Sequence, residues 1–445
     1  MKETEKKIIK FISDNNLLSS DSAVLCAVSG GRDSMCMLCI LKALEEDLHI
    51  KVCAAHYNHC IRGEEANRDE KFVRDYCQEH GTDFVSLKEN VPALAEKEGM
   101  SVEEAGRHFR YAFLKNAAQE LGCDVIATAH NMNDNAETVL FNLSRGAGLK
   151  GLSGIPVKRE NIIRPLLCLS RAEIDGYIEN NSIPFVDDSS NLSDIYSRNI
   201  IRHKVIPVLE SFNSEAVSAI NSAASLLKDD DDALRALAES FIKENGADGI
   251  DCSKLCALPR AVSSRVIRSV FPYGLSCRQV DSVLSICRES EHKELDLPGG
   301  GVAVDQGRLY ICPEDEKPAF EEVPLAAGQK VNIPELNMNI LAEETVLDEN
   351  VHGLLNTFYI KCDEIQGRLI VSPKRDGDSM RISGRGCSKS LKKLFLENHI
   401  NRYHRLRTIV IRDDKGILSV PGLAISERAA AKAGERVLKI IIENL

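Results

Sequence analysis

The stretch Ser29-Gly30-Gly31-Arg32-Asp33-Ser34 joins an apolar run at residues 23–28 to a second apolar run at residues 35–44. The first run is short and apolar throughout, which predicts a buried strand, and the second predicts a helix. Two adjacent glycines at the join let backbone N–H groups close around an anion. The dipole and unpaired N–H groups of a helix N-terminus favour a phosphate at the same place. The stretch therefore predicts a nucleotide-binding loop in an α/β fold.

Asp33 is the unusual member of this loop, because a carboxylate beside phosphates repels them. Its presence is explained if it holds a Mg²⁺ ion that bridges to the phosphate oxygens. The alternative is a simple glycine turn in which Asp33 and Ser34 cap the helix. The loop is not a Walker A motif, since no Gly-Lys-Ser/Thr follows, and it lacks the G-x-G-x-x-G dinucleotide pattern.

Residues 21–190 alternate between strand-like and helix-like segments. The expected strands are 23–28, 51–56, 84–87 and 125–128, and the expected helices are 35–45, 64–80, 102–121 and 135–143. Strands separated by helices predict a parallel, doubly wound sheet covered on both faces. Because sites in such sheets form at the carboxyl ends of the strands, the segments after Val28, His56 and Thr128 are expected at one edge.

The length of 445 residues predicts about three domains. We expect the α/β domain at residues 1–215, a mostly helical middle domain at 216–330 and a small α+β domain at 336–445. The acidic run at 229–232 is expected to be a solvated helix end or linker. Residues 316–335, with their prolines, are expected to be a linker with little regular structure.

Composition favours a soluble cytoplasmic protein. Hydrophobic residues are 43% and charged residues 28% of the chain, and no stretch approaches the ~18 apolar residues that span a bilayer. The fifteen cysteines are odd in number and have no framework spacing, which indicates reduced thiols.

Charge is distributed unevenly along the chain. The net charge of −11 argues against a uniformly basic nucleic-acid binder. Residues 368–412, however, hold twelve Lys/Arg against three Asp/Glu. A local basic face on an acidic protein is compatible with a folded RNA partner.

Two residue pairs have spacings that metal ligands also use. His56 and His59 follow an expected strand, but no third ligand is evident nearby. A polar strand exit, or a wall of the nucleotide pocket with Arg62 near phosphate or RNA, explains them as well. Cys36 and Cys39 form a single CxxC on the expected sheet-facing side of a helix, which favours core packing.

Two arginine pairs lie at helical spacing. Arg107 and Arg110 are three residues apart, and Arg198 and Arg202 are four apart, so each pair shares a helix face. The face with Arg107 and Arg110 is either solvated or a clamp for phosphate. The face with Arg198 and Arg202 is expected to be a surface helix face.

Asp134 and Glu137 place two carboxylates on one face of a helix's first turns. Acids there also suit the helix dipole. Two clustered carboxylates can alternatively grip an ammonium group, or hold a nucleophilic amine until its proton is removed.

Taken in order, these motifs resemble those of the tRNA(Ile)-lysidine synthase family. The loop by itself is similar to the PP-loop ATP pyrophosphatase superfamily, whose members cleave ATP between the α and β phosphates and leave AMP on a substrate oxygen. The resemblance covers residues 20–215 closely and the middle region more loosely. It returns at three C-terminal motifs: Arg375-Asp376-Gly377-Asp378, Ser390-Leu391-Lys392-Lys393-Leu394-Phe395, and Ile417 with Pro421-Gly422.

The resemblance implies an ATP-dependent enzyme that forms a carbon–nitrogen bond. Such an enzyme adenylates O2 of the wobble cytidine in the CAU anticodon of tRNA(Ile), and the amine of free L-lysine then displaces AMP at C2. ATP and Mg²⁺ are the implied cofactors, and tRNA(Ile), lysine and a second copy of the chain are the implied partners. Residues 1–215 would be catalytic, 216–330 would recognise substrate and 336–445 would bind tRNA.

Residue by residue, the resemblance assigns three groups of contacts. The implied ATP-binding residues are Ser29, Gly30, Gly31, Arg32, Asp33 and Ser34, with Asp33 also on Mg²⁺. The implied catalytic residues are Asp33, Arg110, Asp134, Glu137 and Arg202, of which Asp134 and Glu137 hold lysine. The implied contacts to the tRNA acceptor stem are Lys389, Lys392, Lys393 and Arg402.

The chain departs from the family's His-His-x-Asp-Asp-Gln pattern at Asn131, Asn133 and Asn135. Asn133 lacks the charge of the Asp that is common in the family. Two rival functions stay open at this point. A tRNA thiolase of the same superfamily would deliver sulfur to an adenylated base, and a non-enzymatic RNA-binding protein would use only the basic segment.

Overall fold

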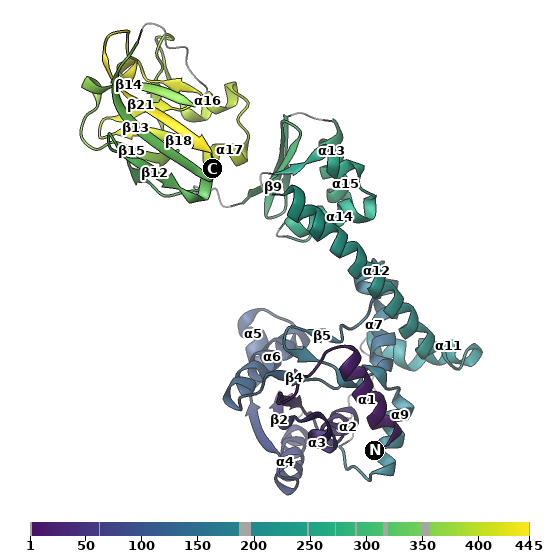
Figure 1. Ribbon diagram of the computed structural model, residues 1–445. Coiled ribbons are helices and arrows are strands. Elements are labelled where there is room, and N and C mark those ends of the chain that lie inside the picture. The colour runs from purple at the N-terminus through teal and green to yellow at the C-terminus, as the bar shows by residue number, and fades with distance from the viewer. Residues whose placement is uncertain are drawn as a thin grey trace. The chain divides into compact units, whose positions relative to one another are not determined.

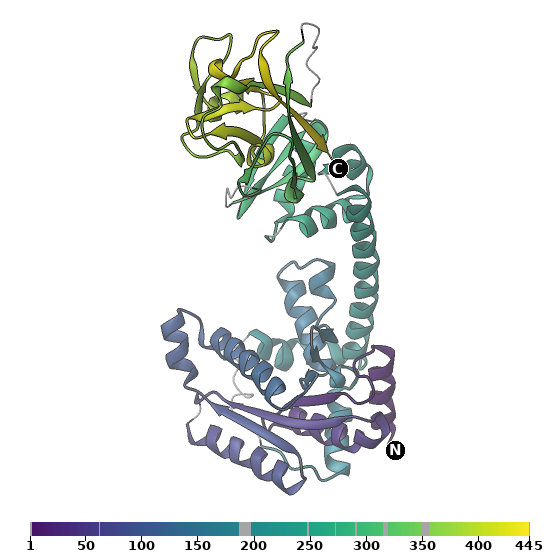
Figure 2. The same cartoon turned by 60° about the vertical axis from the view of Figure 1, so that its left-hand side comes forward.

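The computed structural model describes residues 2–61, 63–186, 197–246, 249–271, 273–289, 292–314, 319–348 and 356–444. The chain divides into two compact units, Met1–Asp232 and Ala233–Leu445, which run from purple to teal and from teal to yellow (Figure 1; Figure 2). Each unit is described below by itself.

The first unit is built on a six-stranded sheet with the order β3-β2-β1-β4-β6-β5. Its strands are β1 (Ala23–Ala27), β2 (Lys51–Asn58), β3 (Asp83–Lys88), β4 (Val125–Ala127), β5 (Lys158–Arg159) and β6 (Ile162–Ile163). All neighbours pair in parallel except β5 and β6, which are antiparallel. The predicted parallel sheet is therefore confirmed, with the short β5–β6 edge as an addition.

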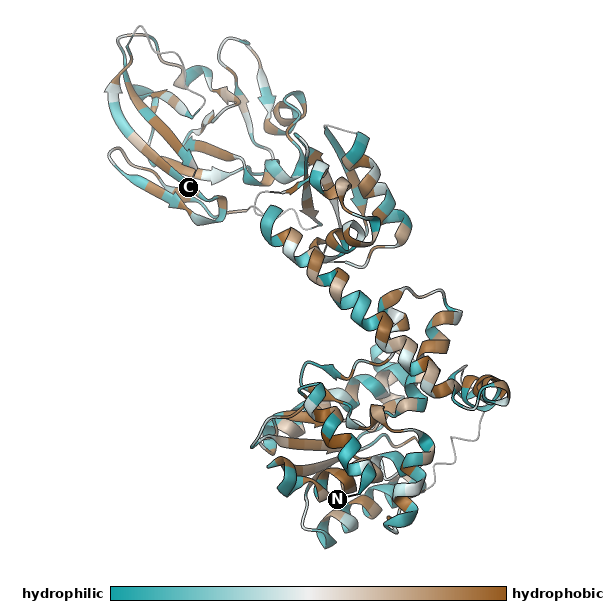
Figure 3. Cartoon of the chain, turned by 45° about the vertical axis from the view of Figure 1, so that its right-hand side comes forward, coloured by the Kyte–Doolittle hydropathy of each residue, from teal (hydrophilic) through white to brown (hydrophobic). Residues whose placement is uncertain are grey.

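Helices cover both faces of this sheet. The helices of this part of the chain are α1 (Glu3–Asp14), α2 (Arg32–Ala43), α3 (Glu45–Leu48), α4 (Glu64–Glu79), α5 (Val91–Glu98), α6 (Val102–Glu120), α7 (Met132–Ser144), α8 (Leu149–Leu152), α9 (Arg171–Asn180), α10 (Ser197–Ile200), α11 (Ile206–Phe212) and α12 (Ala216–Asn245), the last of which continues into the second unit. Of these, α1, α2, α4 and α9 pack on one face of the sheet, and α5 and α6 pack on the other. Val24 and Cys26 of β1 pack in the core with α1, α2 and α9, whereas Leu25 packs with α5 and α6 on the opposite face. Burial on both faces explains why the central strands β1 and β4 read as continuous apolar runs. Apolar segments are brown in Figure 3.

The strand order places a topological switch point beside β1. The chain leaves β1 and returns as β2 on one side, while β4 pairs with the other side of β1. The loops after β1 and β4 therefore open into the same crevice, the usual ligand position in such sheets.

The second unit contains three larger antiparallel sheets. The first has the order β7-β10-β9-β8 and packs against α13 (Cys252–Ala257), α14 (Arg260–Val270) and α15 (Cys277–Glu289). Its strands are β7 (Ile250–Asp251), β8 (His292–Leu297), β9 (Gly300–Asp305) and β10 (Arg308–Pro313).

The other two larger sheets, with α16 (Leu391–Glu397) and α17 (Arg402–Arg407), form the α+β C-terminal part that the sequence predicted. One has the order β11-β15-β18-β19-β20, from β11 (Val323–Pro324), β15 (Ile370–Pro373), β18 (Ile409–Asp413), β19 (Gly416–Val420) and β20 (Ala424–Ile425). The other has the order β12-β13-β21-β14, from β12 (Lys330–Ile333), β13 (Met338–Val346), β21 (Arg436–Asn444) and β14 (Thr357–Lys361).

Two local expectations are wrong. The acidic run at 229–232 lies inside the 30-residue helix α12, because apolar residues continue at helical spacing on both sides of it. Residues 316–335 contain β11 and β12, and in β12 the buried Val331 and Ile333 alternate with polar neighbours over only four residues.

The expected core packing of Cys36 is confirmed, since that side chain is fully buried, and Cys39 packs partly buried beside the same core. All fifteen cysteines are free thiols. Within the parts of the chain that the structure describes, no helix combines the length and apolar composition needed to cross a bilayer.

Candidate active site

The loop between β1 and α2 has a backbone that only glycine accommodates easily. Gly30 has φ +91°, and a Cβ there would lie 3.0 Å from Val186. The Ser34 hydroxyl accepts a hydrogen bond from the backbone N–H of Ser29 at 3.1 Å and donates to the Gly31 carbonyl at 2.8 Å. The alternative of a side-chain cap is wrong, because Gly31 is the N-cap residue before α2 and no side chain caps the helix. Its first N–H groups are therefore not satisfied by a capping side chain and can receive an anion.

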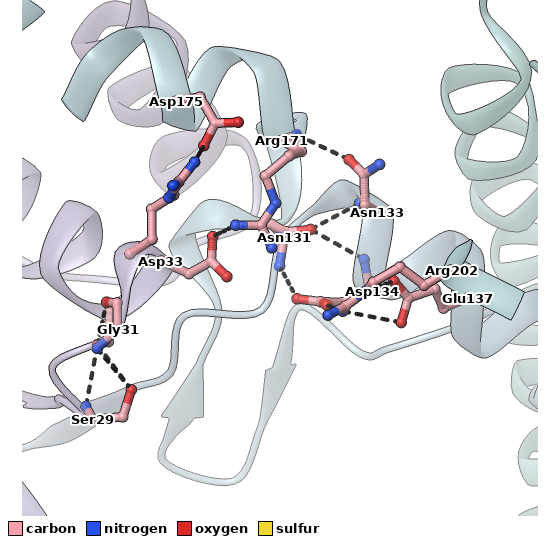
Figure 4. Close-up of polar contacts among 12 residues, drawn as sticks. Ser29, Gly31, Asp33, Asn131, Asn133, Asp134, Glu137, Arg171, Asp175 and Arg202 are labelled. Carbon is pink, nitrogen blue, oxygen red and sulfur yellow. Dashed lines mark hydrogen bonds and ion pairs between the residues drawn. The ribbon is translucent and has the colours of Figure 1, made fainter. Parts of the chain in front are cut away.

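Asp33 points from the first turn of α2 toward α9. Its Oδ1 accepts a hydrogen bond from Arg171 Nη1 at 2.7 Å (Figure 4). Burial raises the pKa of Asp33, and the charge of Asp134 adds to that rise, while Arg171 opposes it. Asp33 thus links the loop electrostatically to the acidic helix α7.

Arg32 is held on the same side. Its Nη1 pairs with Asp175 of α9 at 2.8 Å, and its guanidinium lies 4.6 Å from the Phe185 ring centroid. The structure therefore brings all six loop residues to the crevice edge, with Arg32 and Asp33 both directed at α9.

Asp134 and Glu137 lie together on α7 and share one cation. Arg202 Nε donates to Glu137 Oε1 at 2.6 Å, and Arg202 Nη2 donates to Asp134 Oδ1 at 3.0 Å (Figure 4). Glu137 is only 3% exposed. Two carboxylates around one guanidinium leave a net negative charge at the crevice, which suits a cationic ligand.

The protonation of this cluster follows from its burial. Burial raises the pKa of Glu137, although the hydrogen bond from Arg202 works against the rise. Burial alone would lower the pKa of Arg202, but its bond to Glu137 and the surrounding carboxylates outweigh that effect and raise it. Arg202 therefore stays charged, and Glu137 is the carboxylate best placed to accept a proton.

The three asparagines that depart from the family pattern each hold backbone in place. Asn131 caps α7 by accepting hydrogen bonds from the backbone N–H groups of Asn133 and Asp134. Asn133 Oδ1 accepts the backbone N–H of Arg171 at 2.9 Å, and Asn135 Oδ1 accepts that of Ile155 at 2.6 Å. An uncharged amide is sufficient for all three contacts.

Among the described residues, no hydrogen bond or ion pair joins Arg110 to Asp134 or Glu137, and its charge acts instead on His130. Its guanidinium is 5.5 Å from the Tyr111 ring centroid, and burial lowers its pKa. Burial, together with Arg164, Arg110 and Arg107, lowers the pKa of His130 to about 4 although Asp134 opposes the shift. His130 is therefore a neutral side chain at physiological pH.

His56, near the end of β2, is a polar strand exit, as one of the alternatives predicted. His56 is buried and its Nδ1 lies 2.8 Å from the Val28 carbonyl oxygen, which ties the end of β2 to β1. Burial lowers its pKa. No group of three or more His, Cys, Asp or Glu side chains suited to a metal occurs among the described residues. Arg62, named above with the histidine pair, lies outside them.

Sequence reasoning missed Arg171, which contacts Asp33 from 138 positions away. The available signal was Ser170 with Glu173, a capping box that starts α9 and puts Arg171 in its first turn. The spacing of Ser170 and Glu173 predicted the start of α9 but gave no indication that α9 faces the loop between β1 and α2.

The four C-terminal residues that the resemblance assigns to tRNA contacts fall into two groups. Lys389 Nζ pairs with Glu397 at 2.7 Å, and Arg402 Nη2 donates to the Glu314 carbonyl at 3.3 Å, so both are engaged within the second unit. Lys392 and Lys393 are exposed on α16.

The chain is similar to known proteins over nearly its whole length. A family model described as "PP-loop domain" matches residues 1–209, and one described as "TilS substrate C-terminal domain" matches residues 369–442. A relative from Caldanaerobacter subterraneus subsp. tengcongensis, named tRNA(Ile)-lysidine synthase, is 32% identical over 98% of this chain and 96% of its own length. A relative of the same name from Clostridioides difficile is 32% identical over 99% of each chain. A crystal structure of the TILS C-terminal domain is 26% identical, with a TM-score of 0.26, over 28% of this chain and 96% of that one.

Proposed function

The chain belongs to the tRNA(Ile)-lysidine synthase family, and from this premise we propose that it joins free L-lysine to C2 of the wobble cytidine of tRNA(Ile) bearing a CAU anticodon. ATP is converted to AMP and pyrophosphate in the reaction. The observation that carries the proposal is the meeting of two sites at the β1/β4 crevice. One is a glycine loop before an uncapped helix, which suits phosphates, and the other is a partly buried acidic pair, which suits an amine.

The residues from Ser29 to Ser34 hold the triphosphate of ATP in this proposal. The uncapped N-terminus of α2 and the open backbone at Gly30 support that role. Asp33 fits a Mg²⁺ ion that arrives with ATP, because a single carboxylate plus phosphate oxygens is a common Mg²⁺ ligand set. Bound Mg²⁺ would neutralise charge on the departing pyrophosphate. Arg171 holds the Asp33 carboxylate in position from the opposite side.

Asp134 and Glu137 hold the amino groups of lysine, and one of them accepts the proton of the attacking amine. Adenylation of O2 turns a poor electrophile into one with AMP as its leaving group. The deprotonated lysine amine then forms the new C–N bond at C2, the C2–O2 bond breaks, and AMP leaves. Glu137 accepts the amine proton, because burial raises its pKa toward that task. Arg202 keeps both carboxylates oriented.

Further parts of the proposal concern regions outside the crevice. The middle region, residues 216–330, takes part in substrate recognition, and residues 336–445 bind the tRNA acceptor stem, with the exposed Lys392 and Lys393 as contacts. The enzyme acts in the cytoplasm as a homodimer. Light scattering of the purified chain tests the homodimer, and a monomeric mass would refute that part.

A thiolase is not favoured as an alternative. The matched relatives that cover nearly the whole chain are named lysidine synthases. Cys36, the first cysteine of the CxxC, is fully buried in α2 rather than exposed to a substrate.

Transfer of radiolabelled lysine to a tRNA(Ile) transcript tests the proposal. The wild-type chain should label the transcript only with ATP and Mg²⁺, and Asp33→Ala should lower the rate by about 10³-fold, the scale typical for loss of a key electrostatic contact. Lys42→Ala, on the far end of the same helix and paired with Glu45, is the control and should retain activity. Labelling by Asp33→Ala at the wild-type rate, or transfer of sulfur in place of lysine, would refute the proposal.

A further inference from the structure

A second charged site lies next to the acidic pair in the first unit, a cavity of about 160 Å³. Four arginines from four separate segments line it, together with His130 and Thr138 of the β4–α7 region. The arginines are Arg107, Arg159, Arg164 and Arg198. Neither the glycine loop nor the acidic pair contributes to its lining.

Arg164 is a buried cation in need of a counter-charge. It is 4% exposed, its Nη1 donates to the Pro156 carbonyl at 2.5 Å, and its Nε has no hydrogen-bond partner among the described residues. The described parts of the chain also provide no carboxylate in an ion pair with Arg164 or Arg107. Burying an unpaired guanidinium is costly, so an anionic ligand in the cavity would supply the missing partner.

The residues around the cavity add to its positive charge. Arg107 and Arg110 both lie against the ring of Tyr111, at 5.1 Å and 5.5 Å from its centroid. Asp134 and Glu137 of α7, the helix that also contributes Thr138 to the lining, are already bound to Arg202. The neutral imidazole of His130 adds hydrogen-bonding capacity without adding charge.

The cavity is built on a fixed loop. Gly154 has φ +74°, and a Cβ there would lie 2.1 Å from Asn135 Oδ1. Asn135 accepts the backbone N–H of Ile155, and its own Nδ2 donates to Asn221 Oδ1 at 2.8 Å. Arg164 holds the next carbonyl, that of Pro156. The donors therefore stand in preset positions, as an oxyanion site requires.

Two oxyanions could reach this place, the phosphates of ATP and the backbone phosphates of RNA. The triphosphate already has its own loop, which does not line the cavity. The charge of Asp134 acts on both Asp33 and His130, so the acidic pair lies near both phosphate sites. A base flipped toward that pair brings its flanking phosphodiester along with it. Arginine is also the residue best suited to bind such a group.

We propose that this arginine cavity binds a backbone phosphate of the anticodon loop next to the wobble cytidine. The inference rests on the proposed function and deepens it, because it assigns to the first unit its own contact with the RNA. Arg107, Arg159 and Arg198 are exposed and form the entrance, and Arg164 forms the buried end.

The first test measures binding of the full chain to an anticodon stem–loop RNA without ATP or lysine. Arg107→Ala combined with Arg159→Ala removes two exposed arginines and should raise Kd about tenfold or more. The slope of log Kd against log salt should fall by about one, as expected for lost phosphate contacts on single-stranded RNA. Lys115→Ala is the control, since it removes an exposed cation from the same helix α6 as Arg107. An unchanged Kd, or a loss equal to that of the control, would overturn the proposal.

The second test replaces one phosphodiester beside the wobble cytidine by a neutral methylphosphonate. This change should weaken binding to the wild type by about tenfold and leave binding to the double variant almost unaffected. Equal losses in both proteins would overturn the proposal. A raised Kd for ATP with unchanged RNA binding would overturn it too, by assigning the cavity to the nucleotide. None of these readouts needs catalysis, so a chain that binds as expected but forms no lysidine would refute the reaction and not the cavity.

Discussion

Arg202 is the residue on which the acidic pair depends. It is one third exposed, whereas the Glu137 side chain is almost completely buried. Arg202→Ala therefore leaves a buried carboxylate without its partner, and we expect a loss of about 2 kcal/mol in the free energy of unfolding of the first unit. Thermal unfolding should show this as a decrease in Tm of about 5 °C.

A double variant distinguishes the effect of Glu137 on stability from its role as the proton acceptor. Glu137→Gln added to Arg202→Ala removes the uncompensated charge, so most of the lost Tm should return. Lysine transfer should stay lost, because the proton acceptor is absent. A double variant that is as unstable as Arg202→Ala would show that Glu137 is not the carboxylate that Arg202 stabilises.

Arg171 sets the pH range over which Asp33 is ionised. Burial raises the pKa of Asp33 and Arg171 works against that rise. Arg171→Met should therefore raise this pKa further. Because Mg²⁺ needs the ionised carboxylate, activity grows as pH increases through the pKa of Asp33. The acidic limb of pyrophosphate release should move to higher pH in Arg171→Met and stay in place in Lys42→Met. An unmoved limb in Arg171→Met would mean that Asp33 does not control it.

Among elements, the loop from Gly154 to Pro156 links α7, α12 and the arginine cavity. Gly154→Ala meets both a left-handed backbone and Asn135 Oδ1 at 2.1 Å. Gly146→Ala is a matched control, because Gly146 has φ +73° and nothing within 4 Å of an added Cβ. We expect Gly154→Ala to cost at least about 1 kcal/mol more than Gly146→Ala in thermal unfolding. Equal losses would show that the loop moves freely away from Asn135.

The elements also show which parts of the fold the sequence could predict. Residues 23–28 and 125–128 were recognisable as strands because burial on both faces leaves continuous apolar runs. The strands β5 and β6 have two residues each, too few for any periodicity. The acidic run at 229–232 was expected to be a helix end or linker because a run of carboxylates is typical of a solvated segment, but it lies inside α12.

For the site, the sequence could identify residues but not all of their partners. Asp134 and Glu137 were predicted from local helical spacing, and Arg202 was named only through the family resemblance. Its contact with both carboxylates was not predicted. The contact of Asp33 with Arg171 depends on where α9 packs, which no local pattern reports. Arg110 was assigned to catalysis with Arg202, yet the structure groups it with His130.

At the scale of the whole molecule, the chain is acidic overall, but its C-terminal part contains basic residues that differ in how exposed they are. Lys392 and Lys393 are exposed on α16, whereas Lys389 and Arg402 are engaged within the second unit. We expect Lys392→Ala with Lys393→Ala to raise Kd for full tRNA(Ile) about tenfold and to lower the salt slope by about two. Binding of the isolated anticodon stem–loop should not change.

Arg402→Ala should behave differently from the double variant of Lys392 and Lys393. Its guanidinium donates to the Glu314 carbonyl, so its loss should lower the Tm of the second unit more than Lys392→Ala with Lys393→Ala does. A stable Arg402→Ala that loses tRNA binding would reverse these assignments and make Arg402 an RNA contact.

The central claim is that the phosphate loop and the acidic pair carry out two successive steps at one crevice. A single-turnover experiment with enzyme, ATP, Mg²⁺ and tRNA(Ile), but without lysine, tests it most directly. Pyrophosphate should appear while AMP stays attached to the tRNA, and added lysine should then release AMP in equal amount to the lysine bound. Release of AMP before lysine is added, or its discharge by a sulfur donor and not by lysine, would contradict the account.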